Sequence, residues 1–320
     1  MAYYLRLPAK SNQPDPRYLN IVDGKSSAVQ RALRRGGLAG FEPPTMAALM
    51  TLFDMQEPGF TFVDVGANIG IYSALCSALF EPSEVVAFEP TPRTASITRK
   101  IARVNKAITR VEQIALGDTP GSAQLYLSAR SDASNSMVEG FKENTGTVEV
   151  AVETLDDYVE ANKITPNVMK IDAESFEPQI LAGARDVLAT HRPVIVIEVL
   201  NHRGRDHGDN VAAVMREHGY FYYPCSTYSD WEPHATIVGD KQEDRNWLFS
   251  PVPLPADFQE RFEVWETVLS ACDRDHNLLK LPSNVPAAGE SDSHSLVHNS
   301  TARARAFLGH IRRAVKRRPT

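Results

Sequence analysis

The sequence predicts an α/β fold with a mostly parallel sheet, helices on both of its faces and an antiparallel pair of strands at one edge. From Phe60 onward, short apolar runs rich in β-branched residues alternate with longer amphipathic stretches, which is typical of βα units. Near the end of this region a predicted helix is followed closely by two apolar runs, and this spacing favours an antiparallel edge pair. A chain of 320 residues, 42% of them hydrophobic, is long enough for one such core with appendages.

The elements follow from these patterns in order. Parallel strands are expected at Thr61–Val65, Glu84–Phe88, Arg110–Ala115, Asn167–Ile171 and Pro193–Val199. Helices are expected at Ile71–Leu79, Pro92–Asn105, Glu177–Ala189 and Asn210–His218, and the edge pair at Tyr220–Tyr223 and Asn246–Phe249. Between the third and fourth strands, Gln124–Ser128 and Thr147–Val152 predict a hairpin, with the polar loop Ser131–Asn144 as its tip.

The chain is expected to divide into five segments. Residues 1–60 form a helical lead-in, with helices near Ala28–Leu33 and Met46–Met55, and residues 61–252 form the α/β domain. A C-terminal helix is expected within 253–281, a flexible Ser-, Pro-, Ala- and Gly-rich linker at 282–300, and a basic amphipathic helix at 301–320. That last helix has two interpretations, contact with an anionic membrane surface or a solvated terminus.

Composition excludes several classes of protein. The formal net charge of -6 gives no basic field of the kind that duplex nucleic acid needs. Cys76, Cys225 and Cys272 lie far apart and lack zinc-ligand spacing, so they are expected to be reduced thiols in a cytoplasmic protein. Residues 1–10 contain no apolar run of the length that a signal peptide or membrane span requires.

The strongest motif is a glycine turn that leads from the first parallel strand into a helix, Phe62-Val63-Asp64-Val65-Gly66-Ala67-Asn68-Ile69-Gly70. Gly66 and Gly70 have no Cβ and can take positive φ, so backbone N–H groups can approach a nucleotide-like ligand closely. The dinucleotide pattern GxGxxG fails, because Asn68 and Ile71 stand where it needs glycine. We therefore expect Gly66, Asn68 and Gly70 to bind a nucleoside cofactor other than NAD.

Acidic residues at the strand ends indicate which cofactor this is. S-adenosylmethionine carries a free α-ammonium that Asp64 can hold, whereas pyrophosphate would be repelled by the same carboxylate. Glu89 ends the second strand and is placed to accept hydrogen bonds from both ribose hydroxyls. After the third strand, Leu116 is expected to cover the adenine face and Asp118 to accept from its exocyclic amine, although Gly117–Gly121 also has the composition of a simple turn.

Several further motifs stand in a recognisable order. They are Phe88-Glu89-Pro90, Thr154-Leu155-Asp156, Met169-Lys170-Ile171-Asp172-Ala173-Glu174-Ser175-Phe176-Glu177 and Leu181-Ala182-Gly183-Ala184. With the glycine turn, these motifs resemble the FkbM family of methyltransferases over residues 61–200. The resemblance implies a Rossmann-like class I methyltransferase sheet, S-adenosylmethionine as methyl donor, and hydroxyl groups of sugars, glycans, polyketides or lipid-linked products as acceptors. Ser175 departs from the glycine that the family usually has there.

The candidate catalytic residues are Asp172, Glu198 and His202. Asp172 and Glu174 follow the fourth strand and Glu198 ends the fifth, so all three acids should meet at the carboxyl edge of the sheet. Transfer of a methyl group to oxygen needs alignment and a base that takes the hydroxyl proton. No metal is assigned, although three acids at one edge leave a divalent cation as an alternative.

Two residues near this edge have structural alternatives. Glu177 stands at the start of a predicted helix and is expected mainly to cap it. Trp231 has the chemistry to stack on a sugar ring, but packing against the last strands explains it equally well.

The prediction for the whole chain is an S-adenosylmethionine-dependent O-methyltransferase that acts on a sugar, glycan or other small molecule. Two alternatives are weighed against it. An NAD-dependent oxidoreductase is disfavoured because the GxGxxG turn and a Tyr-x-x-x-Lys pair are absent from the sequence. A catalytically silent binding module of the same fold is disfavoured because Asp64, Gly66, Glu89 and Asp172 are all present.

Overall fold

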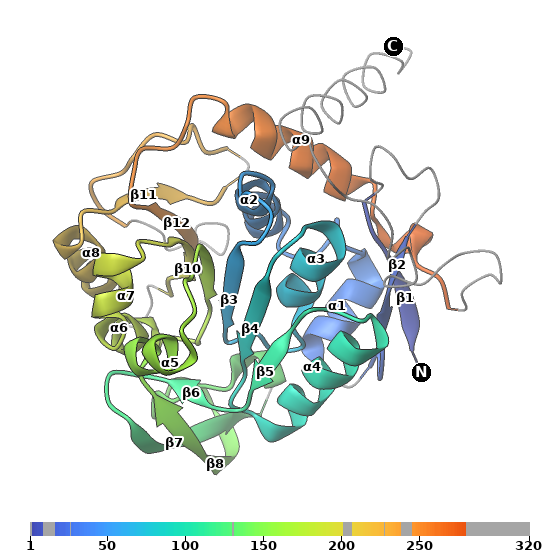
Figure 1. Ribbon diagram of the computed structural model, residues 1–320. Helices are drawn as coiled ribbons and strands as arrows, with labels where there is room; N and C mark the ends of the chain where they lie inside the picture. The colour runs from blue at the N-terminus through green and yellow to red at the C-terminus, as the bar shows by residue number, and fades with distance from the viewer. Residues whose placement is uncertain are drawn as a thin grey trace.

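A computed structural model describes residues 2–8, 17–25, 27–129, 131–200, 207–226, 228–237 and 245–279. Its centre is a seven-stranded sheet in the order β11-β12-β10-β9-β3-β4-β5 (Figure 1). The parallel strands are β3 (Thr61–Val65), β4 (Glu84–Phe88), β5 (Arg110–Glu112), β9 (Val168–Ile171) and β10 (Val194–Glu198). The edge strands β11 (Phe221–Pro224) and β12 (Asn246–Ser250) form the antiparallel pair, which confirms the predicted fold class.

Helices cover both faces of this sheet, as Figure 1 shows. One face carries α2 (Pro43–Asp54), α3 (Ile71–Leu79) and α4 (Pro92–Val104), and the other carries α5 (Leu155–Asn162), α6 (Glu177–Ala182), α7 (Arg185–Thr190) and α8 (His207–Glu217). Alternate residues of a strand point to opposite faces of the sheet, so Phe62 packs into the first apolar core and Val63 into the second. This doubly covered sheet explains why the strands read as nearly continuous apolar runs.

The lead-in contains strands that the sequence did not predict. β1 (Tyr3–Arg6) and β2 (Tyr18–Ile21) form a small antiparallel sheet. The two predicted helices are present as α1 (Ala28–Gly36) and α2, and α1 begins with a capping box between Ser27 and Gln30. Each strand has only four residues, which is too short for a period-2 pattern to stand out.

The C-terminal helix α9 (Phe258–Ser270) packs along α2 and is followed by the 3-10 turn η3 (Arg274–His276). Beyond it, the backbones of Tyr4 and Leu278 exchange two hydrogen bonds of 2.7 and 2.9 Å. The first and last described segments therefore lie side by side and contribute to one apolar core. The predicted boundaries at residues 60 and 252 stay a prediction. None of the helices that the structure describes has the length and apolar composition needed to cross a bilayer.

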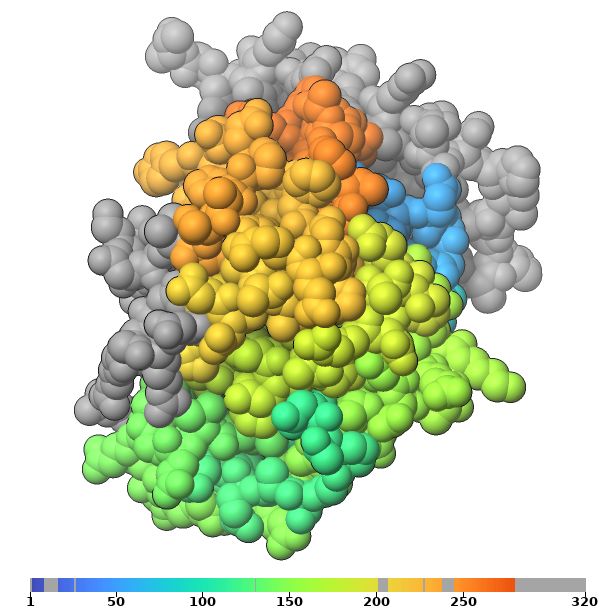
Figure 2. Space-filling model, turned by 90° about the vertical axis from the view of Figure 1, so that its left-hand side faces the viewer, coloured from blue at the N-terminus to red at the C-terminus, as the bar shows by residue number. Residues whose placement is uncertain are grey.

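The predicted strand Arg110–Ala115 is divided between two sheets. Its first half is β5, while β6 (Ala115–Leu116) leaves the main sheet and pairs with β8 (Asn144–Glu153). β8 also pairs antiparallel with β7 (Gly121–Ser128), which confirms the predicted hairpin. Figure 2 looks onto the face covered by α6–α8 and shows this hairpin, in green, at the end of the molecule opposite α9.

The predicted helix Glu177–Ala189 is likewise divided, into α6 and α7. Gly183 separates them, and a Cβ at this position would overlap the carbonyl oxygen of Gly117. The carboxylate of Asp156 accepts hydrogen bonds from the backbone N–H groups of Asp186 and Val187, so it caps the second helix. The two motifs around Asp156 and Gly183 thus fix how α5, α6 and α7 pack.

Candidate functional site

A cavity of about 420 Å³ opens at the edge of the sheet where β3, β4, β9 and β10 end. Its wall is built from the glycine turn, the tips of these strands, the lead-in and the hairpin tip. This volume lies in the usual range for small-molecule sites, and the position at the carboxyl ends of parallel strands is where open α/β sheets bind ligands.

The glycine turn after β3 is tied to the neighbouring strand. The backbone N–H groups of Gly66 and Ala67 both donate to the carbonyl oxygen of Phe88, each at 3.0 Å. Gly66 has a φ of 74°, and a Cβ there would overlap the carbonyl oxygen of Asp172. Because any side chain would push the tips of β3 and β9 apart, this position requires glycine.

Asn68 and Gly70 occupy different places in the same turn. Asn68, at a φ of 50°, lines the cavity, and its N–H donates to Oε2 of Glu89 at 3.0 Å. Gly70 is not part of the cavity lining, and a Cβ there would press on the side-chain methyl of Thr98 in α4. The structure thus gives Gly70 a packing function between α3 and α4, and its contact with a cofactor stays a prediction.

Glu89, at the tip of β4, is 5% exposed and lines the cavity. Besides accepting from Asn68, its carboxylate accepts from the backbone N–H of Thr91 at 2.8 Å. Burial raises the pKa of Glu89 to about 7, and the two backbone donors oppose that shift. The carboxylate is therefore held rigidly by backbone, and its remaining lone pairs are available to a ligand.

Asp64 lies deeper than Glu89, with an exposure of 1%. It borders the cavity, but its Oδ2 accepts a hydrogen bond of 2.7 Å from the hydroxyl of Ser73 in α3. Burial raises its pKa, and the Ser73 hydroxyl and Lys170 lower it. Lys170 stands opposite Asp64 in the register between β3 and β9, so the acid shares a buried charge network with that ammonium.

The two residues predicted on the adenine side are separated by the structure. Leu116 is buried and lines the cavity, as expected for an apolar cover. Asp118 is exposed and does not line the cavity. Because β6 ends at Leu116 and joins the small sheet, Asp118 falls in the turn that leads into β7, which is the alternative weighed for Gly117–Gly121.

Three acids meet at the tips of β9 and β10, as predicted. Asp172, Glu174 and Glu198, hereafter the carboxylate cluster, present oxygens that all lie within 4.8 Å of one another. The Lys170 ammonium contacts Oδ2 of Asp172 at 2.6 Å, and the Lys142 ammonium contacts Oε2 of Glu174 at 3.2 Å. Oε2 of Glu198 is buried and has no hydrogen-bond partner among the described residues.

The three acids of the carboxylate cluster differ in their pKa. Burial raises the pKa of Asp172, but Lys170, Glu198 and Arg245 together outweigh burial, and the net direction is downward. Burial first and then the negative charge of Asp172 raise the pKa of Glu198 well above its usual value. The same two causes raise the pKa of Glu174 to about 7. The pKa values of Asp172 and Glu198 are therefore shifted in opposite directions, and a pair of unequal acids suits proton transfer.

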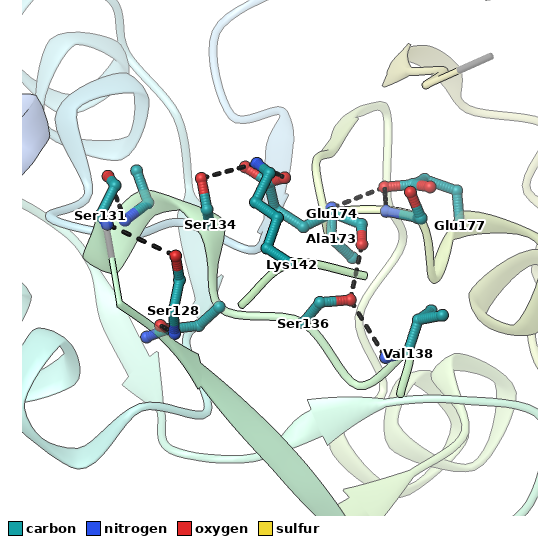
Figure 3. A network of polar contacts seen from close by, with 12 residues as sticks. Ser128, Ser131, Ser134, Ser136, Val138, Lys142, Ala173, Glu174 and Glu177 are labelled. Atoms are coloured by element: carbon teal, nitrogen blue, oxygen red, sulfur yellow. Dashed lines mark hydrogen bonds and ion pairs between the residues drawn. The ribbon is translucent and has the colours of Figure 1, made fainter. Parts of the chain in front are cut away.

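The loop between β9 and α6 is strained. Glu174 and Ser175 both have left-handed backbones, with φ of 51° and 80°. Oε1 of Glu177 accepts from the backbone N–H groups of Ala173 at 2.8 Å and of Ser175 at 3.3 Å (Figure 3). Glu177 therefore acts as a clamp on the loop before α6, in addition to standing in the first turn of that helix.

The hairpin tip lies against this loop, as Figure 3 shows. Lys142 bridges the hydroxyl of Ser134 and the carboxylate of Glu174, and the Ser136 hydroxyl donates to the carbonyl oxygen of Glu174 at 2.7 Å. On its other side the tip contacts the lead-in, since Asp132, in the 3-10 turn η1 (Asp132–Ser134), accepts from the Ala28 N–H at 2.8 Å. The loop predicted to be the hairpin tip therefore forms one wall of the cavity.

A family model described as the methyltransferase FkbM domain matches residues 64–222, which include the glycine turn, Glu89 and the carboxylate cluster. This chain belongs to the FkbM methyltransferase family. The resemblance inferred from the sequence motifs is confirmed.

Two relatives illustrate what this FkbM family member is similar to. The hexuronic acid methyltransferase AglP of Haloferax volcanii is 31% identical over 146 residues, which cover 45% of this chain and 58% of AglP. The 31-O-demethyl-FK506 methyltransferase FkbM of Streptomyces tacrolimicus is 27% identical over 193 residues, or 51% of this chain and 74% of that protein. The match thus spans less than two thirds of the length of AglP.

Among solved structures, a methyltransferase FkbM from Methylobacillus flagellatus is 18% identical to this chain. The superposition covers 60% of this chain and 43% of that one, with a TM-score of 0.42.

One candidate residue of this FkbM family member lies away from the cavity, and another lies outside the described residues. Trp231 is 7% exposed and packs edge-on against Phe258 and Phe262, with ring centroids 4.7 and 4.8 Å apart. Its packing interpretation therefore holds, and Trp231 does not line the cavity. His202, the third predicted catalytic residue, lies outside the described residues.

Sequence reasoning missed several residues that line the cavity, namely Glu42, Tyr72, Lys142, Lys170 and Arg245. Lys170 could have been found from the sequence, because a charged residue inside the otherwise apolar strand Val168–Ile171 needs a buried partner of opposite charge. No sequence pattern pointed to Glu42 or Arg245, because both lie outside the FkbM match and reach the site only through the tertiary fold.

Proposed function

We propose that this chain is an S-adenosylmethionine-dependent O-methyltransferase that methylates a hydroxyl of a sugar, a glycan or another small molecule. The observation that carries this proposal is a single cavity that is lined both by a glycine turn with an acid at the next strand tip and by the carboxylate cluster. FkbM family membership supports the same conclusion.

The charge of the cavity wall supports a sulfonium cofactor over a pyrophosphate one. The acids that line it are Glu42, Asp64, Glu89, Asp132, Asp172, Glu174 and Glu198. The basic residues that line it are Arg35, Lys142, Lys170 and Arg245. Because acids outnumber bases, the wall favours a ligand that brings positive charge and disfavours a dinucleotide with two phosphates.

Residues of the cavity wall suit separate parts of the cofactor. Glu89 is held by two backbone donors and can accept from both ribose hydroxyls, and Leu116 supplies apolar cover for the adenine. Gly66, without a Cβ, leaves the backbone of the turn open to close approach. The cofactor, when bound, supplies a methyl group already activated on a sulfonium.

The reacting residues are proposed at the carboxylate cluster. Asp172 is kept ionised by Lys170 and can accept the proton of an acceptor hydroxyl, with Glu198 beside it as the second member of the pair. His202 is retained as a further candidate base, although it lies outside the described residues. The main work of the site is to align the acceptor oxygen with the methyl group while excluding water.

The acceptor class is inferred from chemistry and from relatives together. An acid pair suits a neutral hydroxyl, which must lose a proton on methylation. One relative is named for hexuronic acid and another for an O-methylated site on FK506, so hydroxylated sugars and polyketide-like molecules are the first acceptors to test.

Calorimetry of the purified chain with S-adenosylmethionine and with NAD tests the cofactor assignment. We expect binding of S-adenosylmethionine only, and its loss in Glu89→Ala. Asp118→Asn is the matched control, because this acid is exposed and does not line the cavity. Binding of NAD, or equal losses in both variants, would contradict the proposal. Methyl transfer from labelled donor to a panel of sugars then tests turnover.

Location and partners form a further part of the proposal. All three cysteines are buried and unpaired, which suits a reducing compartment such as the cytoplasm. The basic segment 301–320 lies outside the described residues, and its proposed role is contact with an anionic membrane surface. Cosedimentation of the full chain with anionic and with neutral vesicles distinguishes that role from a solvated terminus.

A further inference from the structure

Glu42 brings a carboxylate to the cavity from outside the FkbM match. It stands immediately before α2, at a φ of 44°, and is followed by Pro43 and Pro44. Its Oε2 accepts a hydrogen bond of 2.6 Å from the hydroxyl of Tyr72, which lies in the first turn of α3. The lead-in is therefore fastened to the helix that the glycine turn begins.

The carboxylate of Glu42 forms no ion pair with the described residues. No described lysine or arginine nitrogen lies within 4.0 Å of its carboxylate, whereas Asp172 and Glu174 each have a lysine ammonium. Burial raises the pKa of Glu42, and the more distant charge of Lys170 opposes this shift. A cationic ligand group beside Glu42 would supply the missing partner.

The position of Glu42 matches one part of the proposed cofactor. If the ribose is at Glu89 and the methyl group faces the carboxylate cluster, the methionine end must cross the tip of β3 toward α2 and α3. Asp64 is below that tip, 1% exposed and already bonded to Ser73. Glu42 lines the cavity and accepts a hydrogen bond from Tyr72 of α3. An α-ammonium has three donors and a full charge, so a carboxylate is its natural partner.

We propose that Glu42 binds the α-ammonium of S-adenosylmethionine and that the Tyr72 hydroxyl orients its carboxylate. This inference rests on the proposed function and adds a cofactor contact supplied by the lead-in. Tyr72 is a positioning residue here, because its hydroxyl acts through Glu42 and its ring lies under the Lys170 ammonium, 5.1 Å from the ring centroid.

The test compares two ligands that differ only in the amine. S-adenosylhomocysteine and its analogue lacking the α-amino group are titrated by calorimetry into the wild-type chain and Glu42→Gln. The glutamine keeps an oxygen that can accept from Tyr72 and removes the charge. We expect Glu42→Gln to weaken S-adenosylhomocysteine binding about tenfold or more while leaving the analogue unaffected, because a hydrogen bond to a charged group is lost for one ligand only.

Tyr72→Phe provides the second variant, and a smaller loss confined to the amine-bearing ligand is expected. Equal losses for both ligands would mean that Glu42 is merely structural, and no loss would mean that it does not touch the amine; either result overturns the inference. If the wild-type chain binds neither ligand, the proposed function itself fails, and that outcome is distinct from the loss of selectivity.

Discussion

Ser175→Gly is expected to stabilise this protein, although it removes a side chain that is only 1% exposed. Ser175 has a φ of 80°, and its hydroxyl is buried without a hydrogen-bond partner among the described residues. A left-handed conformation costs an ordinary residue about 1–2 kcal/mol, and an unsatisfied buried hydroxyl costs about 1–3 kcal/mol. Glycine relieves both penalties.

Two terms oppose this gain. Glycine makes the unfolded chain more flexible, at about 0.4–1 kcal/mol, and the lost methylene gives up about 0.8 kcal/mol of apolar burial. At the midpoints of these four terms, the free energy of unfolding rises by about 2 kcal/mol. The hydrogen bond from the Ser175 N–H to Glu177 is unaffected, since it comes from the backbone.

Urea denaturation of the purified chain, followed by fluorescence and circular dichroism, measures this change. Ser73→Gly is the matched control: Ser73 is also 1% exposed, but it lies in α3 and donates to Asp64 at 2.7 Å. We expect the control to be destabilised by about 2–4 kcal/mol, from glycine in a helix and from the lost bond to a carboxylate. If Ser175→Gly also lowers the free energy of unfolding, the account of strain in this loop is wrong.

Three further predictions concern stability and cofactor requirements. Gly66→Ala and Gly219→Ala both place alanine near a φ of +70°, but only at Gly66 would the Cβ meet backbone atoms. In urea denaturation we therefore expect Gly66→Ala to lower the free energy of unfolding by about 1–3 kcal/mol more than Gly219→Ala, and equal losses would count against the close approach of β3 and β9. Burial raises the pKa of Glu177 from 4.5 to about 8, so its contribution to the free energy of unfolding is full below pH 4.5 and is lost as the pH rises through 8. Glu177→Gln should therefore gain stability relative to wild type between pH 5 and pH 8, and a difference between the two proteins that stays constant with pH would refute this expectation. Turnover should survive EDTA, because lysine ammonium groups already neutralise two acids of the carboxylate cluster, and a loss restored by Mg²⁺ would instead establish the cation alternative.

Much of the fold was predictable because local patterns and tertiary structure agree. The strand Thr61–Val65 and the helix Ile71–Leu79 have the predicted bounds, because a short apolar run ends at the glycine turn and a longer apolar run begins after it. The breaks at Gln113–Ile114 and at Gly183 were missed. Both depend on contacts with distant residues, Val152 in one case and Gly117 in the other, that local patterns do not contain.

The site was predictable to the extent that it lies at strand tips. Asp64, Glu89, Asp172 and Glu198 all border the cavity, because the ends of parallel strands converge at one edge. Asp118 was placed there by the same reasoning, but its strand leaves the sheet first. Glu42 arrives from another part of the chain altogether, so no pattern near the FkbM motifs could have revealed it.

The packing of α2 against α9 has a consequence for how the protein is made. Nine successive residues of α2, from Thr45 to Phe53, are buried in the finished protein, and α9 ends more than two hundred residues later, at Ser270. During synthesis, at about 5–20 residues per second, the emerging α2 therefore waits some tens of seconds for the helix that covers it. Throughout that interval an apolar surface is open to chaperones, and ribosome-bound chains stopped before residue 258 should capture them more strongly than chains that include α9.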